Sequence, residues 1–154
     1  MPGPGGRDPS TRTDIARTPQ QVFDFLSDTA NWTRLDRALI SMTPHGPVSI
    51  GTAGKATHRR AGGMRATTSW TVTDLVPGVR LAMRIVGRGY QLTETIELGS
   101  RAAGTTVDVT DRLVASSWLG RLMVPFSRGI IEGDLRARSA TLKALLETRA
   151  APVP

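Results

Sequence analysis

Residues 64–113 alternate between apolar and polar side chains in four consecutive stretches that turn-forming residues separate. In the first stretch Trp70 and Val72 fall on one face, whereas Arg65 and Thr71 fall on the other. A period of two residues is typical of a β-strand, and strands joined by short turns pair antiparallel. One apolar face and one face rich in Arg and Thr indicate a sheet with one side on the core and one in water.

The segment before this sheet predicts a strand and two short helices. Residues 11–16 have the length of a short strand. Thr18 is suited to cap a helix over residues 19–27, because Gln21 completes a capping box. Asn31 is expected to cap a second short helix. The stretch that follows is punctuated by Pro and Gly and adds further strands, which gives a sheet of about seven.

The C-terminal part, residues 118–148, predicts one long helix that crosses the whole sheet. Pro125 should kink or divide this helix, and Gly129 and Gly133 weaken its middle. The glycines are expected to leave room for a cavity between helix and sheet; the alternative is that they permit close helix–sheet packing. The apolar residues are expected to form one stripe: Leu119, Leu122, Met123, Phe126, Ile130, Ile131, Leu135, Leu142, Leu145 and Leu146.

The composition favours one domain without a metal or cofactor. The chain has 154 residues, so we expect a single domain over residues 11–149 between flexible tails at 1–10 and 150–154. There is no Cys and there are only two His, His45 and His58, which excludes thiolate zinc sites and iron–sulfur clusters and disfavours a His-rich metal centre. The sequence contains no serine-nucleophile elbow, P-loop or dinucleotide motif.

The net charge is +7, and 18 of the 20 basic residues are Arg. No nucleic-acid motif accompanies this charge, so we expect no specific nucleic-acid partner. The favoured interpretation is a solvated outer face; weak attraction to anionic lipid or to an acidic carrier protein is the alternative. No apolar run is long enough to span a membrane and no secretory signal is evident, so a cytoplasmic protein is expected, of unknown oligomeric state.

Four stretches carry a family resemblance: residues 16–28, the pair Asn31-Trp32, residues 70–81 and residues 134–147. In this order they resemble the START-like (SRPBCC) superfamily, and within it the polyketide cyclase/dehydrase family. The resemblance covers about residues 11–148. It implies an α+β helix-grip fold, in which a curved antiparallel sheet wraps a long C-terminal helix around an apolar cavity. Members of the superfamily bind lipids, sterols, polyketides or hormones, and some cyclise or hydrolyse, so the fold does not select one activity.

Two carboxylates interrupt the apolar face of the sheet. Glu94 lies between Leu92 and Ile96, and Asp111 lies between Val109 and Leu113. A carboxyl group in an apolar cavity has a raised pKa and can act as a catalytic acid or base, or can orient a ligand hydroxyl. The alternatives are that a bulge or strand end turns each one to water, or that each pairs with an Arg.

The candidate ligand-binding residues besides Gly129 and Gly133 are large side chains expected to face the cavity: Trp70, Met64, Met83, Tyr90 and Phe126. Plain core packing is the alternative for each. Arg65 is expected on the opposite face from Trp70, unlike the cavity Arg of aromatase/cyclase relatives. The sequence does not fix the direction of His58.

These observations favour a protein that binds a small hydrophobic molecule, lipid-like or polyketide-like, between sheet and helix. The second hypothesis is a polyketide cyclase or dehydratase, with Glu94 or Asp111 as acid or base and Tyr90 or an Arg as carbonyl partner. The third is an interaction module with a filled interior and a basic surface. A cavity much smaller than a typical pocket of about 300 Å³ would favour the third.

Overall fold

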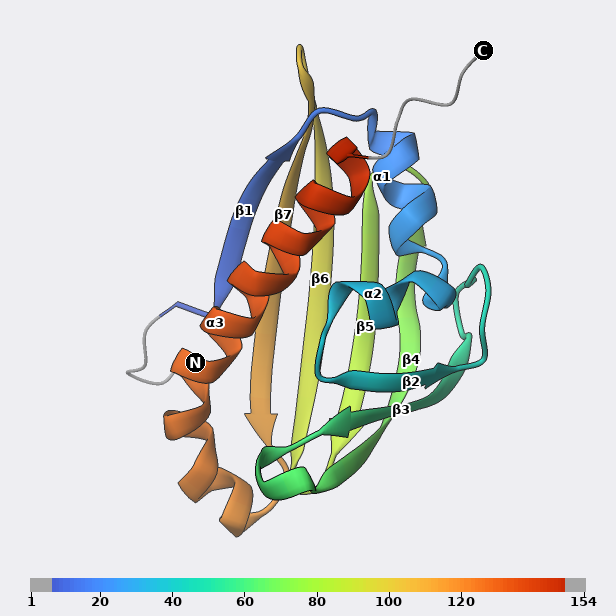
Figure 1. The fold of residues 1–154 in the computed structure, drawn as a ribbon. Helices are drawn as coiled ribbons and strands as arrows, with labels where there is room; N and C mark the ends of the chain where they lie inside the picture. The colour runs from blue at the N-terminus through green and yellow to red at the C-terminus, as the bar shows by residue number, and fades with distance from the viewer. Residues whose placement is uncertain (1–6, 149–154) are drawn as a thin grey trace.

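One seven-stranded antiparallel sheet wraps around a long helix in the computed structural model, which describes residues 7–148 (Figure 1). The strand order is β1-β7-β6-β5-β4-β3-β2. This confirms the predicted α+β helix-grip fold. The strands are β1 (Ser10–Ile15), β2 (Leu39–Thr43), β3 (Ala53–Arg59), β4 (Arg65–Val76), β5 (Arg80–Gly87), β6 (Tyr90–Arg101) and β7 (Gly104–Ala115). The helices are α1 (Pro19–Leu26), α2 (Trp32–Leu35) and α3 (Trp118–Thr148), with 3₁₀ turns η1 (Thr29–Asn31) and η2 (Ala61–Gly63).

The two short helices form where the capping residues predict them. The Thr18 hydroxyl accepts a hydrogen bond from the Gln21 N–H at 3.2 Å, and the Gln21 side chain accepts one from the Thr18 N–H at 3.0 Å. This reciprocal pair is the predicted capping box of α1. Asn31 precedes α2 but does not cap it through its side chain. Its amide donates instead to the Phe25 carbonyl at 3.0 Å and so ties α2 to α1.

The inner face of the sheet follows the predicted alternation. Trp70 pairs across β4 and β5 with Ile85, and Ile96 pairs across β6 and β7 with Val109. Trp70, Ile96 and Val109 are buried, whereas outward residues such as Arg84 are exposed. The core therefore lies between the inner face, α1, α2 and the second half of α3.

Helix α3 runs diagonally across the inner side of the sheet and packs against β1 and β7. Pro125 does not divide it, although the ribbon changes direction in its first half (Figure 1). The expectation of one continuous apolar stripe was wrong. Leu135, Leu142 and Leu146 are buried, whereas the stripe from Leu119 to Ile130 is exposed. Ile130 and Ile131 are adjacent and therefore about 100° apart on a helix, so the two halves of the pattern lie on different faces.

Residues 1–6 of the predicted N-terminal tail and the whole predicted C-terminal tail, 150–154, lie outside the described residues. The end of the predicted N-terminal tail is placed against the sheet: β1 begins at Ser10, and the Pro9 carbonyl accepts a hydrogen bond from the Asp111 N–H at 2.9 Å. Within residues 7–148, no helix combines the length and the hydropathy that crossing a bilayer demands.

Candidate ligand site

Glu94 and Asp111 are direct neighbours on the inner face of the sheet. They form a cross-strand pair between β6 and β7, and each residue is 3% exposed. Met83 lies opposite Glu94 on β5, so Met83, Glu94 and Asp111 form one row across β5, β6 and β7. Two acidic side chains side by side in an apolar interior are costly unless one is neutralised or both are paired with a cation.

Arg138 of α3 supplies that cation. Its Nη2 donates to Glu94 Oε2 at 2.6 Å, and its guanidinium carbon lies 5.7 Å from the centre of the Trp32 ring on α2. Arg138 lies three residues after Leu135 and four before Leu142, so the buried face of α3 carries it to the sheet. The cation is therefore held between a carboxylate and an aromatic face.

The environment neutralises Asp111. Burial and the neighbouring charge of Glu94 raise the pKa of Asp111 to about 9, against the smaller opposing effect of Arg138. Burial acts to lower the pKa of Arg138, but the charge and hydrogen bond of Glu94, together with the charges of Asp111 and Asp36, raise it overall. At neutral pH the cluster therefore contains an ion pair, Glu94 with Arg138, and a protonated Asp111 that can donate a hydrogen bond.

A second pair lies beside the cluster. His58 of β3 points to the interior side, and its Nε2 lies 3.6 Å from Asp36 Oδ2 at the end of α2. Burial acts to raise the pKa of Asp36, but His58, the Ala38 N–H and Arg138 together lower it. The structure thus gives His58, whose direction the sequence left open, a carboxylate partner. Among buried atoms, His58 Nδ1 has no hydrogen-bond partner within the described part of the chain.

A partly open cavity of about 20 Å³ borders Glu94 and Arg138. This volume is room for about one water molecule or one functional group, far below a typical ligand pocket of about 300 Å³. By volume alone the interior therefore favours the third hypothesis, an interaction module with a filled interior. Nearby on β4, Thr68 Oγ1 and Trp70 Nε1 are buried without a hydrogen-bond partner among residues 7–148. The residues that line the cavity are Leu26, Trp32, Leu35, Glu94, Ile96, Val109, Arg138, Ser139 and Leu142.

The next row of the inner face is apolar and only partly covered. Ile85, Leu92 and Leu113 are cross-strand neighbours on β5, β6 and β7, and each is half-buried. We call these three residues the open strip. It lies between the Glu94–Asp111 row and the end of the sheet where Tyr90 pairs with Ala115. A molecule that covered the open strip would therefore meet the carboxyl pair at one end.

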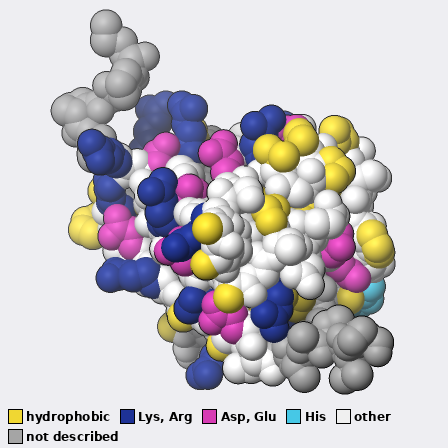
Figure 2. Space-filling model, turned by 90° about the horizontal axis from the view of Figure 1, so that it is seen from above, with side chains coloured by type: hydrophobic (Ala, Val, Ile, Leu, Met, Phe, Trp, Pro, Cys, Tyr) yellow, Lys and Arg dark blue, Asp and Glu magenta, His cyan; other side chains and the backbone are white. Residues whose placement is uncertain are grey.

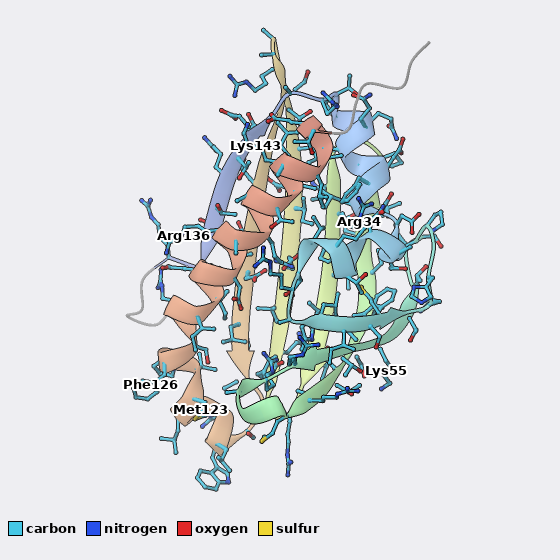
Figure 3. All side chains as sticks on the ribbon, in the orientation of Figure 1. Arg34, Lys55, Met123, Phe126, Arg136 and Lys143 are labelled. Carbon is cyan, nitrogen blue, oxygen red and sulfur yellow. The ribbon has the colours of Figure 1, made fainter. Side chains whose placement is uncertain are left out.

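The structure brings together only some of the side chains that the sequence indicated. Trp70 and Met83 are buried on the inner face beside the cluster. Tyr90 is half-buried at the far end of the open strip, with its ring over Gly87. Met64 and Phe126 line neither cavity nor strip. Met64 directly follows the turn between β3 and β4, and Phe126 points away from the sheet in Figure 3.

Gly129 and Gly133 also lie outside the cavity. Each stands two residues before a residue packed on the core, Ile131 or Leu135, and a separation of two residues on a helix is about 200°. Both glycines therefore face away from the sheet, and an added Cβ at either would meet no atom within 4 Å. They neither leave room for the cavity nor permit close packing of α3 on the sheet.

The sequence did not indicate three residues in and around the cluster: Arg138, Trp32 and Asp36. For Arg138 a signal existed, because its spacing from Leu135 and Leu142 places it on the apolar stripe of the helix. Arg136 lies only two residues away, and the two Arg together resemble the charged, solvent-exposed face of a helix. The inward position of Arg138 was therefore not recognised. Trp32 and Asp36 come from the loop-rich segment around α2, whose path over the sheet has no periodic signal.

Comparison with known proteins identifies the family. A family model described as polyketide cyclase / dehydrase and lipid transport matches residues 9–147. The chain belongs to this family. No curated protein sequence matches the chain. The assignment confirms the predicted family and brings with it no single substrate, since its description covers both catalysis and transport.

Solved structures share the fold at low sequence identity. A protein from Rhodobacter sphaeroides superposes with a TM-score of 0.74 at 15% identity, covering 96% of this chain and 97% of that one. A Mycobacterium smegmatis protein gives 0.69 at 11% identity, with 92% and 91% covered. The di-domain ARO/CYC protein StfQ of the steffimycin biosynthetic pathway gives 0.75 at 11% identity, with 91% of this chain and 50% of StfQ covered. Such identities establish the helix-grip fold alone.

Proposed function

We propose that this member of the polyketide cyclase/dehydrase family binds a small, mostly apolar molecule that carries a carbonyl or hydroxyl group. The apolar body lies over the open strip, and the polar group meets Glu94 and Asp111 at the end of that strip. The observation that carries the proposal is the charged cluster itself. It is buried next to a cavity whose other lining is mainly apolar, and it adjoins an apolar row that the protein leaves partly uncovered.

The cluster offers such a polar group both kinds of hydrogen bond. A protonated Asp111 donates to a carbonyl oxygen, and the Glu94 carboxylate accepts from a hydroxyl. Hydrogen bonds that involve a charged group in a dry site discriminate strongly against an analogue without the matching polar atom. The cavity is too small for a whole ligand, and no residue of the open strip lines it. The proposal therefore places only the polar group at the cluster and the apolar body over the open strip.

The proposal predicts that Glu94→Gln weakens selection for the polar group. The test titrates 1-hydroxyanthraquinone, which carries carbonyl and hydroxyl groups, and anthracene, which carries neither. It follows the Trp fluorescence, to which the buried Trp32 and Trp70 contribute. The wild type should prefer the first compound by tenfold or more, since one lost hydrogen bond to a charged group is about 1.5–3 kcal/mol. In Glu94→Gln the preference should fall to less than half.

Glu97→Gln is the matched control, because Glu97 lies on the same strand but on the exposed side. Its preference should equal that of the wild type. Asp111→Asn is a second variant for the same titration, and it leaves the Glu94–Arg138 ion pair in place. Thermal melting curves of each variant check that it is folded. Equal affinities for the two compounds in the wild type, or an unchanged preference in Glu94→Gln, would refute the proposed role of the cluster.

A second candidate function is ring closure of a polyketide, and the protonated Asp111 favours it. In an aldol closure Glu94 would take the α-proton, a C–C bond would form, and the attacked carbonyl oxygen would receive the Asp111 proton. Asparagine cannot supply that proton. Asp111→Asn should therefore retain binding and lose cyclisation if the protein is an enzyme, whereas a carrier would show no turnover in either form.

A further inference from the structure

The first half of α3 exposes an apolar stripe that the fold leaves without a partner. Its residues follow helical spacing on one side of the helix, and Phe126 is 80% and Trp118 71% exposed. Phe126 and Met123 point away from the sheet in Figure 3. We define the α3 patch as Trp118, Leu119, Leu122, Met123, Phe126 and Ile130. Soluble proteins rarely expose several contiguous large apolar side chains, and such patches usually mark interaction sites.

The same end of the molecule is basic. Residues 59–65, 86–90 and 114–128 contain six Arg and no Asp or Glu. These are the β3–β4 turn, the β5–β6 turn and the start of α3. They belong to one end of the sheet: Tyr90 pairs with Ala115, and the Gly89 carbonyl accepts a hydrogen bond from the Ser116 N–H at 2.9 Å. In Figure 1 the β3–β4 turn lies at the same end of the molecule as the start of α3.

The opposite end has a different charge pattern. Viewed from above in Figure 2, acidic and basic side chains alternate there. Ion pairs on that side include Arg101 with Asp14 and Lys143 with Glu147. At the basic end, the first acidic residue of α3 is Glu132, and it pairs with Arg128. Among residues 7–148, no salt bridge involves Arg59, Arg65 or Arg88, whereas Arg128 pairs with Glu132 and Arg60 acts on Asp134. The unpaired positive charge at this end therefore lies mainly in the two turns.

We propose that this end of the protein docks on an anionic phospholipid bilayer, with the α3 patch inserted at the interface and the Arg side chains of the β3–β4 and β5–β6 turns near the lipid phosphates. Aromatic and aliphatic side chains on one side of a helix, flanked by Arg, have the composition of an interfacial helix. Each Arg near an anionic surface adds to the attraction. A convex helix fits a deformable bilayer, and no groove is required.

The charge argues against a second copy of the chain as the occupant. A symmetric dimer through the α3 patch would join two copies at their basic ends, where residues 59–65, 86–90 and 114–128 contain no Asp or Glu. An anionic bilayer instead complements the charge. Docking in this orientation would also place the far end of the open strip, near Tyr90, toward the membrane. The docking test measures vesicle binding and does not depend on ligand binding.

Trp118 provides the readout for the test. It is 71% exposed, whereas the two other Trp residues are 5% and 1% exposed. Vesicles of phosphatidylcholine with 30% phosphatidylglycerol should shift Trp fluorescence to shorter wavelength, and pure phosphatidylcholine vesicles or high salt should reduce the effect strongly. The shift should vanish in Trp118→Phe. A shift that persists in that variant would indicate lipid taken up near Trp70, and would overturn docking through the α3 patch.

The variant Leu122→Ser/Phe126→Ser should bind the anionic vesicles more than tenfold more weakly in a flotation assay. Both side chains are exposed, so the fold should not suffer. Ile50→Ser is the matched control, because Ile50 is 64% exposed but lies in the β2–β3 loop away from α3, and its binding should equal that of the wild type. Equal binding of the double variant, no binding of the wild type, or concentration-dependent dimers that the double variant abolishes would each refute the proposal.

Discussion

Arg138→Leu should lower the free energy of unfolding at pH 7 by about 3–5 kcal/mol. The substitution leaves Glu94, which is 3% exposed and hydrogen-bonded to Arg138 at 2.6 Å, without its cation in an apolar interior. Removing one partner of a buried ion pair costs this much because the remaining charge is neither solvated nor paired. Urea unfolding followed by circular dichroism measures the change.

Arg136→Leu is the control for this prediction. Arg136 lies two residues earlier on α3, is exposed and points away from the sheet, so its loss should change the stability by no more than about 0.5 kcal/mol. The double variant Arg138→Leu/Glu94→Leu should recover most of the lost stability, because both charges are then gone. Similar small effects for Arg138→Leu and Arg136→Leu would show that the ion pair is not buried as described.

Asp111→Asn should stabilise the protein at pH 8 and change its stability little at pH 4. The folded-state pKa of Asp111 is about 9, whereas an unfolded Asp titrates near pH 4. Between these values the folded protein holds a proton that the unfolded chain has released. The stability of the wild type therefore falls as pH rises, by up to about 1.4 kcal/mol per pH unit from this group.

The variant has no such proton, so the difference in unfolding free energy between variant and wild type should grow by about 2–4 kcal/mol from pH 5 to pH 8. The measurement is a set of urea titrations across this range. Asp108→Asn is the control, because Asp108 lies three residues earlier on the outer side and pairs there with Arg12 at 2.7 Å. Parallel pH curves for wild type and Asp111→Asn would contradict the raised pKa.

The sequence predicted the sheet and the inward direction of the two carboxylates well, because alternation reports which face a residue occupies. Glu94 and Asp111 stand at inward positions of two strands, and the structure has both there. Alternation does not report the register between strands, which depends on the turn. Pairing of Arg101 with Gly104 across that turn is what makes Glu94 and Asp111 direct neighbours.

The sequence did not predict that the apolar stripe in the first half of α3 is exposed while that in the second half is buried against the sheet. Apolar periodicity indicates a face but not what covers that face, so the exposed stripe around Phe126 resembled an extension of the core stripe around Leu135. The break becomes visible only when the sheet is in place, because the sheet supports the second half of the helix and not the stripe of the first. The same tertiary packing brings Arg138 to Glu94, across a sequence separation that no local pattern reports.

Native mass spectrometry of protein purified from the organism that encodes it tests the central claim most directly. The claim is that the Glu94–Asp111–Arg138 cluster holds the polar group of a mostly apolar ligand. The account predicts a bound molecule of a few hundred daltons on the wild type and on Glu97→Gln, and strongly reduced occupancy on Glu94→Gln. Equal occupancy on wild type and Glu94→Gln, whether complete or zero, would contradict it.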